Sequence, residues 1–357
     1  MSWKNSILRP EMKTPLSGML PEEIYQVSGL DKPYRALQIF KAVHSSNSTS
    51  VITFNEITTL PLQMRESLSE NFTLMESGVD QVLEDEENNG KLSIVLNDNR
   101  VIECVLLSDS SGRKTACLST QAGCAMGCLF CKTGEGGFYR NLTASEITEQ
   151  FTHLENNFGH ISNIVFMGMG EPLENIDNLF KAAAVLNHRE GRGLSFRRMT
   201  LSTCGLADKI KIIADSGPDM RLAVSLNTAD QEKREKIMPI ARQFGIEELK
   251  KALVYYQQKR DKRITIEYVL ISGFNTADDD AALLRRFCSG LSTMVNLIPW
   301  NPAPGLDFKT PSQKEIQKFC GYLDANSIQY ALRRRKAQKI RGACGQLASG
   351  ESDFTGN

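Results

Sequence analysis

The spacing of apolar residues predicts a small helical module at the start of the chain. Between Leu20 and Phe72 apolar residues recur every three or four positions, which is the period of a helix with one buried face. Prolines that can occupy a first helical turn open three such segments, at Pro21, Pro33 and Pro61. The module carries no motif typical of catalysis.

The period changes to two between Val79 and Leu107, which predicts strands. Lys91–Leu96 and Val101–Leu107 flank the turn residues Asn97-Asp98-Asn99, so we expect a β-hairpin here. Glu103 lies among the apolar residues of the second strand, where a carboxylate is costly unless it is paired or used. From the local sequence alone, the favoured interpretation is that Glu103 faces solvent.

After Ser111, strand-like and helix-like segments alternate. The predicted strands are Lys114–Ser119, Asn163–Met167, Met199–Thr203, Arg221–Leu226, Ile264–Leu270 and Met294–Pro299. The predicted helices are Ala144–Asn156, Ile176–Asn187, Asp208–Asp215, Gln231–Met238, Glu247–Arg260, Asp278–Cys288 and Ser312–Asn326. Six βα units predict an α/β fold whose parallel sheet curls into a partial, TIM-like (β/α)6 barrel. The active site of such a barrel lies at the carboxyl ends of its strands.

Composition narrows the class of protein. The chain has 357 residues, of which 41% are apolar, and this length suits one large domain with an appendage. It shows neither a leader sequence nor an apolar stretch long enough to span a membrane, so we expect a cytoplasmic protein without a membrane partner. Nine cysteines, an odd number, favour reduced thiols with metal or redox roles over a disulfide framework. Basic and acidic residues balance at 42 each, so any nucleic-acid binding must come from local patches.

Three cysteines follow the first predicted barrel strand at a Cys-x3-Cys-x2-Cys spacing: Cys124, Cys128 and Cys131. A structural zinc site needs four ligands, usually with a second pair, and no second pair lies nearby. A 4Fe-4S cluster also normally takes four thiolates. Three on one loop would leave one iron open to a small molecule, which favours a cluster over zinc.

Candidate ligand-binding residues lie at the ends of several predicted strands. The run Met167–Pro172 has glycines that allow close approach of the backbone to a ligand, followed by a carboxylate. Each position alone is also typical of an ordinary strand end. The candidates are Gly170, Glu171, Ser202, Ser225, Leu226, Asn227 and Asn301.

Two cysteines outside the triple motif are candidates for covalent chemistry. Cys117 lies at the predicted barrel mouth, just before the triple motif, whereas Cys344 lies near the end of the chain, where a lone cysteine is most often inert. Basic runs at 259–263 and at 333–336, the latter followed by Lys339 and Arg341, are the candidate phosphate contacts. The second run is the stronger candidate because it directly precedes Cys344.

Four runs carry a resemblance to a known family: Cys117–Cys124, Met167–Pro172, Asn296–Pro302 and Ala343–Leu347. With them, and from about Leu20 to Ala348, the chain resembles the RlmN/Cfr family of radical S-adenosylmethionine (SAM) RNA adenine methyltransferases. It is more similar to the RlmN branch, because Pro299-Trp300 stands where the Cfr branch usually has another pair. The resemblance implies a radical SAM barrel, a 4Fe-4S cluster on the three loop cysteines, and SAM on the strand-end residues.

The resemblance also implies a reaction, the methylation of carbon 2 of an adenine in 23S rRNA and in some tRNAs. The Cys344 thiolate would take a methyl group from one SAM, and a radical derived from a second SAM would activate that methyl for addition to the adenine. Cys117 would release the product by closing a transient disulfide with Cys344, while Glu103 would accept the proton lost from the adenine. An external one-electron donor and an unpaired target base are further implications.

Some positions depart from the family pattern. Asn227 replaces the usual histidine, Ala241 replaces a frequent asparagine, and Gln338, Lys339 and Arg341 stand in a region that tends to be acidic. Two alternatives therefore stay open: carbon-8 methylation or another RNA target, and a non-catalytic RNA-binding protein that holds a cluster. We divide the chain into an accessory module expected to contact RNA (1–90), a hairpin extension (91–109), a radical SAM core (110–342) and a segment carrying the methyl-accepting cysteine (343–357).

Overall fold

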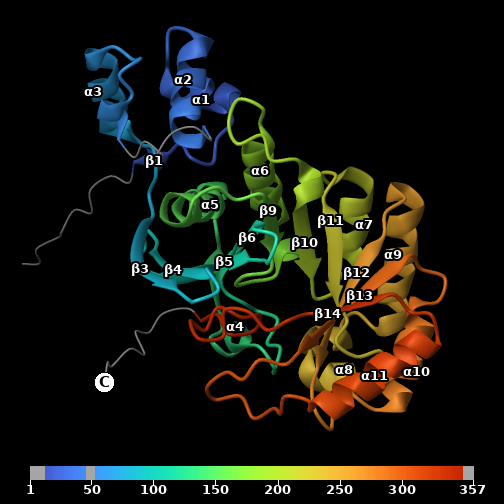
Figure 1. The fold of residues 1–357 in the computed structure, drawn as a ribbon. Coiled ribbons are helices and arrows are strands. Elements are labelled where there is room, and N and C mark those ends of the chain that lie inside the picture. The colour runs from blue at the N-terminus through green and yellow to red at the C-terminus, as the bar shows by residue number, and fades with distance from the viewer. Residues whose placement is uncertain (1–12, 46–52, 349–357) are drawn as a thin grey trace, which may run out of the picture.

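The fold is built on one ten-stranded sheet, seen in a computed structural model that describes residues 13–45 and 53–348. The strand order is β14-β13-β12-β11-β10-β9-β6-β5-β4-β3, and Figure 1 shows the sheet curving with helices packed outside it. The parts of the predicted module at 1–12 and 46–52, and of the predicted final segment at 349–357, lie outside the described residues. No helix of the described residues is long and apolar enough to cross a membrane.

Seven neighbouring strands run parallel and form the partial barrel. They are β6 (Lys114–Cys117), β9 (Asn163–Phe166), β10 (Met199–Thr203), β11 (Arg221–Ser225), β12 (Ile264–Leu270), β13 (Thr293–Pro299) and β14 (Tyr330–Leu332). The first six confirm the strand predictions. The seventh was missed because three residues at a sheet edge are too few to show a period.

Helices connect the parallel strands and cover the outer face of the sheet (Figure 1). Their bounds are α5 (Ala144–Phe158), α6 (Ile176–Asn187), α7 (Ala207–Ser216), α8 (Gln231–Ile237), α9 (Ile246–Arg260), α10 (Asp278–Cys288) and α11 (Gln313–Ala325). All seven predicted helices are confirmed. A capping box opens α5, where Thr143 and Glu146 each satisfy the other's backbone N–H. Apolar side chains between helices and strands form one continuous core.

Three antiparallel strands extend the sheet beyond β6: β3 (Gly78–Glu84), β4 (Gly90–Val95) and β5 (Val101–Ser108). The predicted hairpin is therefore present as β4 and β5. Asn99, in its turn, has a φ of 64°, a conformation that asparagine tolerates better than most residues. The hairpin is continuous with the barrel, because Val105 of β5 pairs with Cys117 of β6.

The N-terminal module has its own apolar core. It contains α1 (Pro21–Ser28), α2 (Pro33–His44), α3 (Leu62–Asn71) and a two-stranded pair, β1 (Thr14–Pro15) with β2 (Phe72–Thr73). The three helices confirm the prediction. The module packs on the barrel, since Val185 of α6 belongs to its core and Ser17 donates a 2.5 Å hydrogen bond to Glu149 of α5.

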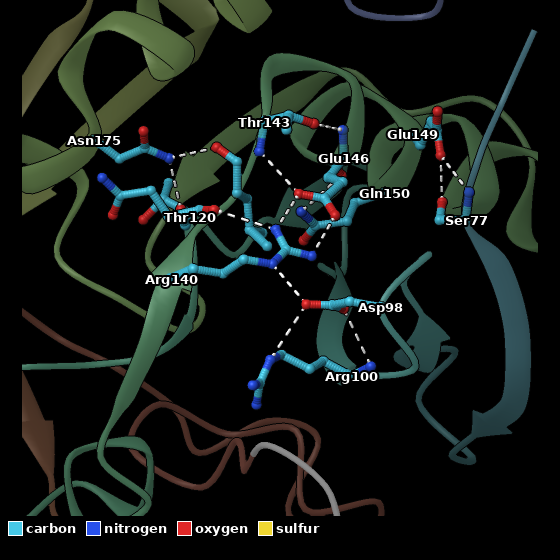
Figure 2. Close-up of polar contacts among 12 residues, drawn as sticks. Ser77, Asp98, Arg100, Thr120, Arg140, Thr143, Glu146, Glu149, Gln150 and Asn175 are labelled. Carbon is cyan, nitrogen blue, oxygen red and sulfur yellow. Dashed lines mark hydrogen bonds and ion pairs between the residues drawn. The ribbon is translucent and has the colours of Figure 1, made fainter. Parts of the chain in front are cut away.

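A short antiparallel pair, β7 (Gln121–Gly123) with β8 (Phe138–Asn141), encloses the cysteine loop and the short helix α4 (Lys132–Glu135). Figure 2 shows how Arg140 of β8 fixes this pair to the rest of the fold. Its guanidinium lies 2.8 Å from Asp98 in the hairpin turn and 2.7 Å from Glu146 of α5. The Arg140 guanidinium in turn lowers the pKa of Asp98. The β7–β8 pair below the cysteine loop is therefore anchored both to the hairpin turn and to α5.

Candidate active site

The cysteine loop is closed at its base by backbone contacts. The N–H of Cys124 donates to the carbonyl of Gly137 at 2.7 Å, and Leu129 donates to the carbonyl of Ile237 at the end of α8 at 3.0 Å. Gly123 has a φ of 79°, and a Cβ there would stand 2.0 Å from the Gly137 oxygen. Only glycine fits at position 123, so this residue determines the backbone conformation at the start of the loop.

The three thiols of the loop are partly buried and influence one another. Burial raises the pKa of Cys124 to about 12, and the charges of Cys131 and Glu171 act in the same direction. Burial, followed by the charges of Cys131 and Cys124, also raises the pKa of Cys128. Cys124 and Cys128 therefore resist ionisation until a positive group approaches, as a metal centre would.

The glycine-rich run after β9 packs against the segment that leads into the cysteine loop. A Cβ on Gly168 would lie 2.6 Å from the Ser119 hydroxyl, and one on Gly170 would lie 2.5 Å from Cβ of Gln121. The two glycines thus allow a close approach of the backbone, as expected, but the group that approaches is the protein segment Ser119–Gln121. Glu171 follows, buried, with its oxygens accepting from the N–H groups of Leu173 and Cys204 at 3.0 and 2.7 Å.

The other strand-end candidates lie where the sequence predicted them. Ser202 is buried near the end of β10, and half-buried Ser225 ends β11. Leu226 and Asn227 follow, both buried. Asn227 has a φ of 59°, and its side-chain oxygen accepts from the N–H of Val269 at 3.0 Å. That oxygen therefore also holds the β11 and β12 ends together.

The segment carrying Cys344 lies against the cysteine loop, as the red ribbon beside α4 shows (Figure 1). The N–H of Lys132 donates to Gly345 O at 2.8 Å, and the Thr133 hydroxyl donates to Leu347 O at 2.7 Å. From the end of β13, the Asn301 amide donates to Cys344 O at 3.3 Å. These bonds place the late cysteine next to the three loop thiols.

Cys344 and Cys117 share this site as free thiols. The Cys344 side chain is exposed, but desolvation by the surrounding protein raises its pKa to about 12. The charges of Cys131 and Cys117 raise this pKa further, while Arg333 lowers it. Burial likewise raises the pKa of Cys117 to about 12. No cysteine pair is bonded among the described residues, so the transient disulfide that the resemblance implies between Cys344 and Cys117 is not supported by the structure.

Glu103 does not face solvent, so the local interpretation was wrong. Its side chain is 13% exposed and forms an ion pair with buried Lys91, 2.7 Å away on the neighbouring strand. Its second oxygen accepts from the N–H of Ala348 at 3.0 Å. The pairing compensates the cost of placing a carboxylate among apolar residues.

Comparisons with known proteins agree with this geometry. Residues 118–284 match the family model described as the radical SAM superfamily. A probable dual-specificity RNA methyltransferase RlmN from Treponema denticola is 49% identical over 337 residues, 94% of this chain and 96% of that protein. The chain belongs to the RlmN family of radical SAM RNA methyltransferases.

Two further matches span nearly the whole length. An RlmN from Thermotoga neapolitana, also named a probable dual-specificity RNA methyltransferase, is 40% identical over 343 residues, covering 94% of this chain and 97% of its own. The crystal structure of a radical SAM methyltransferase from Sphaerobacter thermophilus superposes with a TM-score of 0.88 at 34% identity, covering 94% of this chain and 99% of that one. The expected radical SAM fold is thereby confirmed.

The donor set in this RlmN-family chain fits an iron–sulfur cluster better than a single ion. Within the described ranges, no three His, Cys, Asp or Glu side chains are grouped so that they could hold one metal ion. A cluster of several irons spreads its thiolates wider than one ion does, and three thiols leave one iron for another ligand. Cys124, Cys128 and Cys131 lie on one short loop, and the charges of Cys124 and Cys131 both raise the pKa of Cys128, which agrees with a shared cluster.

Sequence reasoning missed several charged residues at the site. Glu267 of β12 is buried, accepts from the Asn296 amide at 2.9 Å and raises the pKa of Cys344. A lone carboxylate in the apolar strand Ile264–Leu270 was the available signal. Lys91 and Arg234, both buried, were also missed. Their partners are distant in sequence, so no local pattern identifies them.

Proposed function

We propose that this chain methylates carbon 2 of adenine 2503 in 23S rRNA and of adenine 37 in tRNAs. The proposal is supported by a chain 49% identical to an RlmN in which the Cys344 segment contacts the cysteine loop through Lys132 and contacts Glu103 through Ala348. A binding protein without turnover needs neither cysteine outside the cluster loop.

In this proposal the cysteine loop binds the iron–sulfur cluster and the strand ends bind SAM. Cys124, Cys128 and Cys131 would hold a 4Fe-4S cluster. SAM would lie against Gly170, Glu171, Ser202, Ser225, Leu226, Asn227 and Asn301. When bound, these groups supply a methyl donor and one-electron radical chemistry, and the electron comes from an external donor.

The protein's own residues perform the covalent and proton-transfer steps. The Cys344 thiolate accepts the methyl group, which then becomes the link between protein and adenine. Glu103, held by Lys91 and by the N–H of Ala348, accepts the proton lost from the adenine carbon. Cys117 would then attack the sulfur of Cys344, so that a disulfide forms while the bond between that sulfur and the linking carbon breaks. The released carbon takes up a proton and becomes the methyl group of the RNA, and an external reductant must restore the two thiols before another round.

The RNA surface is inferred from charge and accessibility. Arg333, Arg334 and Arg335 are exposed, and the lowering effect of Arg333 on the pKa of Cys344 supports a position of this run near the site. By contrast, Arg260 and Lys262 of the other basic run bond to protein groups. We assign phosphate contacts to the later run and to the N-terminal module, and expect the adenine to leave its stack. A protein that methylates rRNA and tRNA would act in the cytoplasm.

Analysis of the methylated nucleoside tests the proposal. The chain would be reconstituted anaerobically with iron and sulfide, then incubated with SAM, reductant and unmodified rRNA or tRNA. Digestion and mass spectrometry against standards should show 2-methyladenosine. Appearance of 8-methyladenosine would assign the chain to Cfr-like chemistry, and absence of both with an intact cluster would refute catalysis on these RNAs.

A further inference from the structure

Among the residues that the structure describes, Arg234 is a buried cation without an acidic partner. It lies on α8 with an exposed fraction of 0%. Its guanidinium donates only to backbone carbonyls, those of Cys204 at 2.6 Å, Leu226 at 3.3 Å and Phe244 at 3.5 Å. Across residues 13–45 and 53–348, no carboxylate forms an ion pair with it. Burial lowers its pKa accordingly.

A buried charge of this kind is costly. Carbonyl dipoles satisfy the N–H groups of the guanidinium, but they do not neutralise its charge. Another largely buried arginine of the fold does have a partner of opposite charge: Arg192 forms an ion pair with Glu155 at 2.8 Å. Arg234 therefore lacks a counter-charge that the fold provides elsewhere.

The surroundings of Arg234 indicate what the missing anion is. The charged or ionisable groups that act on its pKa are the thiols of Cys204 and Cys128, and Cys128 belongs to the cysteine loop. The helix that carries Arg234 contacts that loop directly, because the carbonyl of Ile237 accepts from Leu129 at 3.0 Å. The guanidinium is thus held by α8 near Cys128 of the cysteine loop.

We propose that Arg234 is the counter-charge of the iron–sulfur cluster and makes its one-electron reduction easier. The inference rests on the proposed function, in which Cys128 is a cluster ligand. Thiolate ligation adds negative charge to this buried region, and an electron from the external donor adds one more. A fixed positive charge nearby stabilises the reduced state more than the oxidised state. Arg234 is a positioning residue in this role, since it touches neither substrate nor cofactor.

The alternative is that Arg234 only joins the ends of β10 and β11 to the segment at Phe244. The two roles predict different results when the charge is removed but a hydrogen-bond donor is kept. Arg234→Gln keeps a donor without the charge, and Arg234→Lys keeps the charge with fewer donors. Arg260→Met is the matched control, because Arg260 also donates to three backbone carbonyls, of Ile213, Ala214 and Gly217, but lies away from the cysteine loop.

The test is the reduction potential of the reconstituted cluster, measured by a mediated titration followed by electron paramagnetic resonance, with iron and sulfide content determined for each variant. We expect a more negative potential in Arg234→Gln, and values close to wild type in Arg234→Lys and Arg260→Met. An unchanged potential in Arg234→Gln at full iron content would overturn the role of Arg234. If Arg234→Gln does not fold, Arg234→Met takes its place with the same two outcomes, and a shifted potential in Arg234→Lys at full iron content would also overturn the proposal. A wild-type chain that takes up no cluster refutes the proposed function instead.

Discussion

The carboxylate of Glu103 accepts a hydrogen bond from the backbone N–H of Ala348 at 3.0 Å, across 245 residues of chain. Its other oxygen is held by Lys91 at 2.7 Å. One side chain on the hairpin therefore fixes the segment that carries Cys344, while the same segment restrains the proposed proton acceptor. The proposed proton acceptor, Glu103, and the segment that carries the proposed methyl acceptor, Cys344, are therefore held together by this contact.

Replacing Glu103 with glutamine should separate the steps of the reaction. Glutamine can still accept from Ala348, but it cannot take a proton, so formation of methylated RNA should fall by about 10²–10⁴-fold. Methylation of Cys344 itself should continue, and peptide mass spectrometry would detect it. Lys91→Gln is the control for loss of the ion pair and should reduce turnover less. Equal losses in the two variants would assign Glu103 a structural role only.

Cys344→Ala should abolish methyl transfer, because it removes the proposed methyl acceptor from a segment that Asn301 holds through Cys344 O and Lys132 holds through Gly345 O. Transfer of isotopically labelled methyl from SAM to RNA measures this. Cys320→Ala removes a partly buried thiol on α11 and should leave transfer unchanged. Methylated RNA from the Cys344→Ala chain would refute the covalent mechanism.

Cys117→Ala should trap the covalent product between protein and RNA. Without the thiol of Cys117, nothing attacks the sulfur of Cys344, so the linked species should accumulate as a slower band on a denaturing gel. The double variant with Cys344→Ala should show no such band. A Cys117→Ala chain that releases methylated RNA at the wild-type rate would argue against the resolving role.

Stability should respond to pH through the contact between the module and the barrel. Burial raises the pKa of Glu76 from 4.5 to about 7, with further contributions from the charges of Glu149 and Glu146. The folded state therefore pays an increasing cost for the ionised carboxylate as the pH rises from 4.5 to about 7. Near pH 4.5, Glu76→Gln should unfold at the same temperature as wild type. As the pH rises to about 7, the unfolding temperature of Glu76→Gln should rise progressively above that of wild type.

Circular dichroism on the cluster-free chain would measure this difference without acid damage to a cluster. Above about pH 7 the gain should stay constant, since Glu76 is then ionised in both the folded and the unfolded chain. Glu70→Gln replaces an exposed glutamate of α3 and serves as the control. A gain from Glu76→Gln that does not vary with pH would show that packing, and not ionisation, causes it.

The sequence predicted the elements well because the signals for βα units are local. The period of apolar residues located the six long barrel strands and seven helices, and Pro21 and Pro33 opened helices as expected. The cysteine loop was equally visible, since one short segment supplies all three thiols. The edge strand β14 was too short for such a signal.

Contacts between distant segments were beyond prediction from the residues themselves. Glu103 looked solvent-facing because its partners, Lys91 across the hairpin and Ala348 at the other end of the chain, become neighbours only in the fold. Arg234 reads as part of an ordinary polar helix, Gln231–Ile237, until its burial is known. Cys344 entered through family resemblance alone, since a lone late cysteine carries no local signal.

Asn301 is proposed to contact SAM, and its side chain also holds the segment that carries Cys344. Its amide donates to Cys344 O at 3.3 Å and its oxygen accepts from Gln338 at 3.2 Å, so both ends of the side chain already have protein partners. Asn301→Ala should loosen the Cys344 segment and slow its methylation by about tenfold, the effect of losing roughly 1.4 kcal/mol of restraint. SAM binding, measured by equilibrium dialysis, should weaken as well, because Asn301 is one of the residues proposed to contact SAM. Gln338→Ala, which leaves the bond to Cys344 in place, is the control. Weaker SAM binding with normal methylation at saturating SAM would leave Asn301 the cofactor role only and refute its role in holding the Cys344 segment.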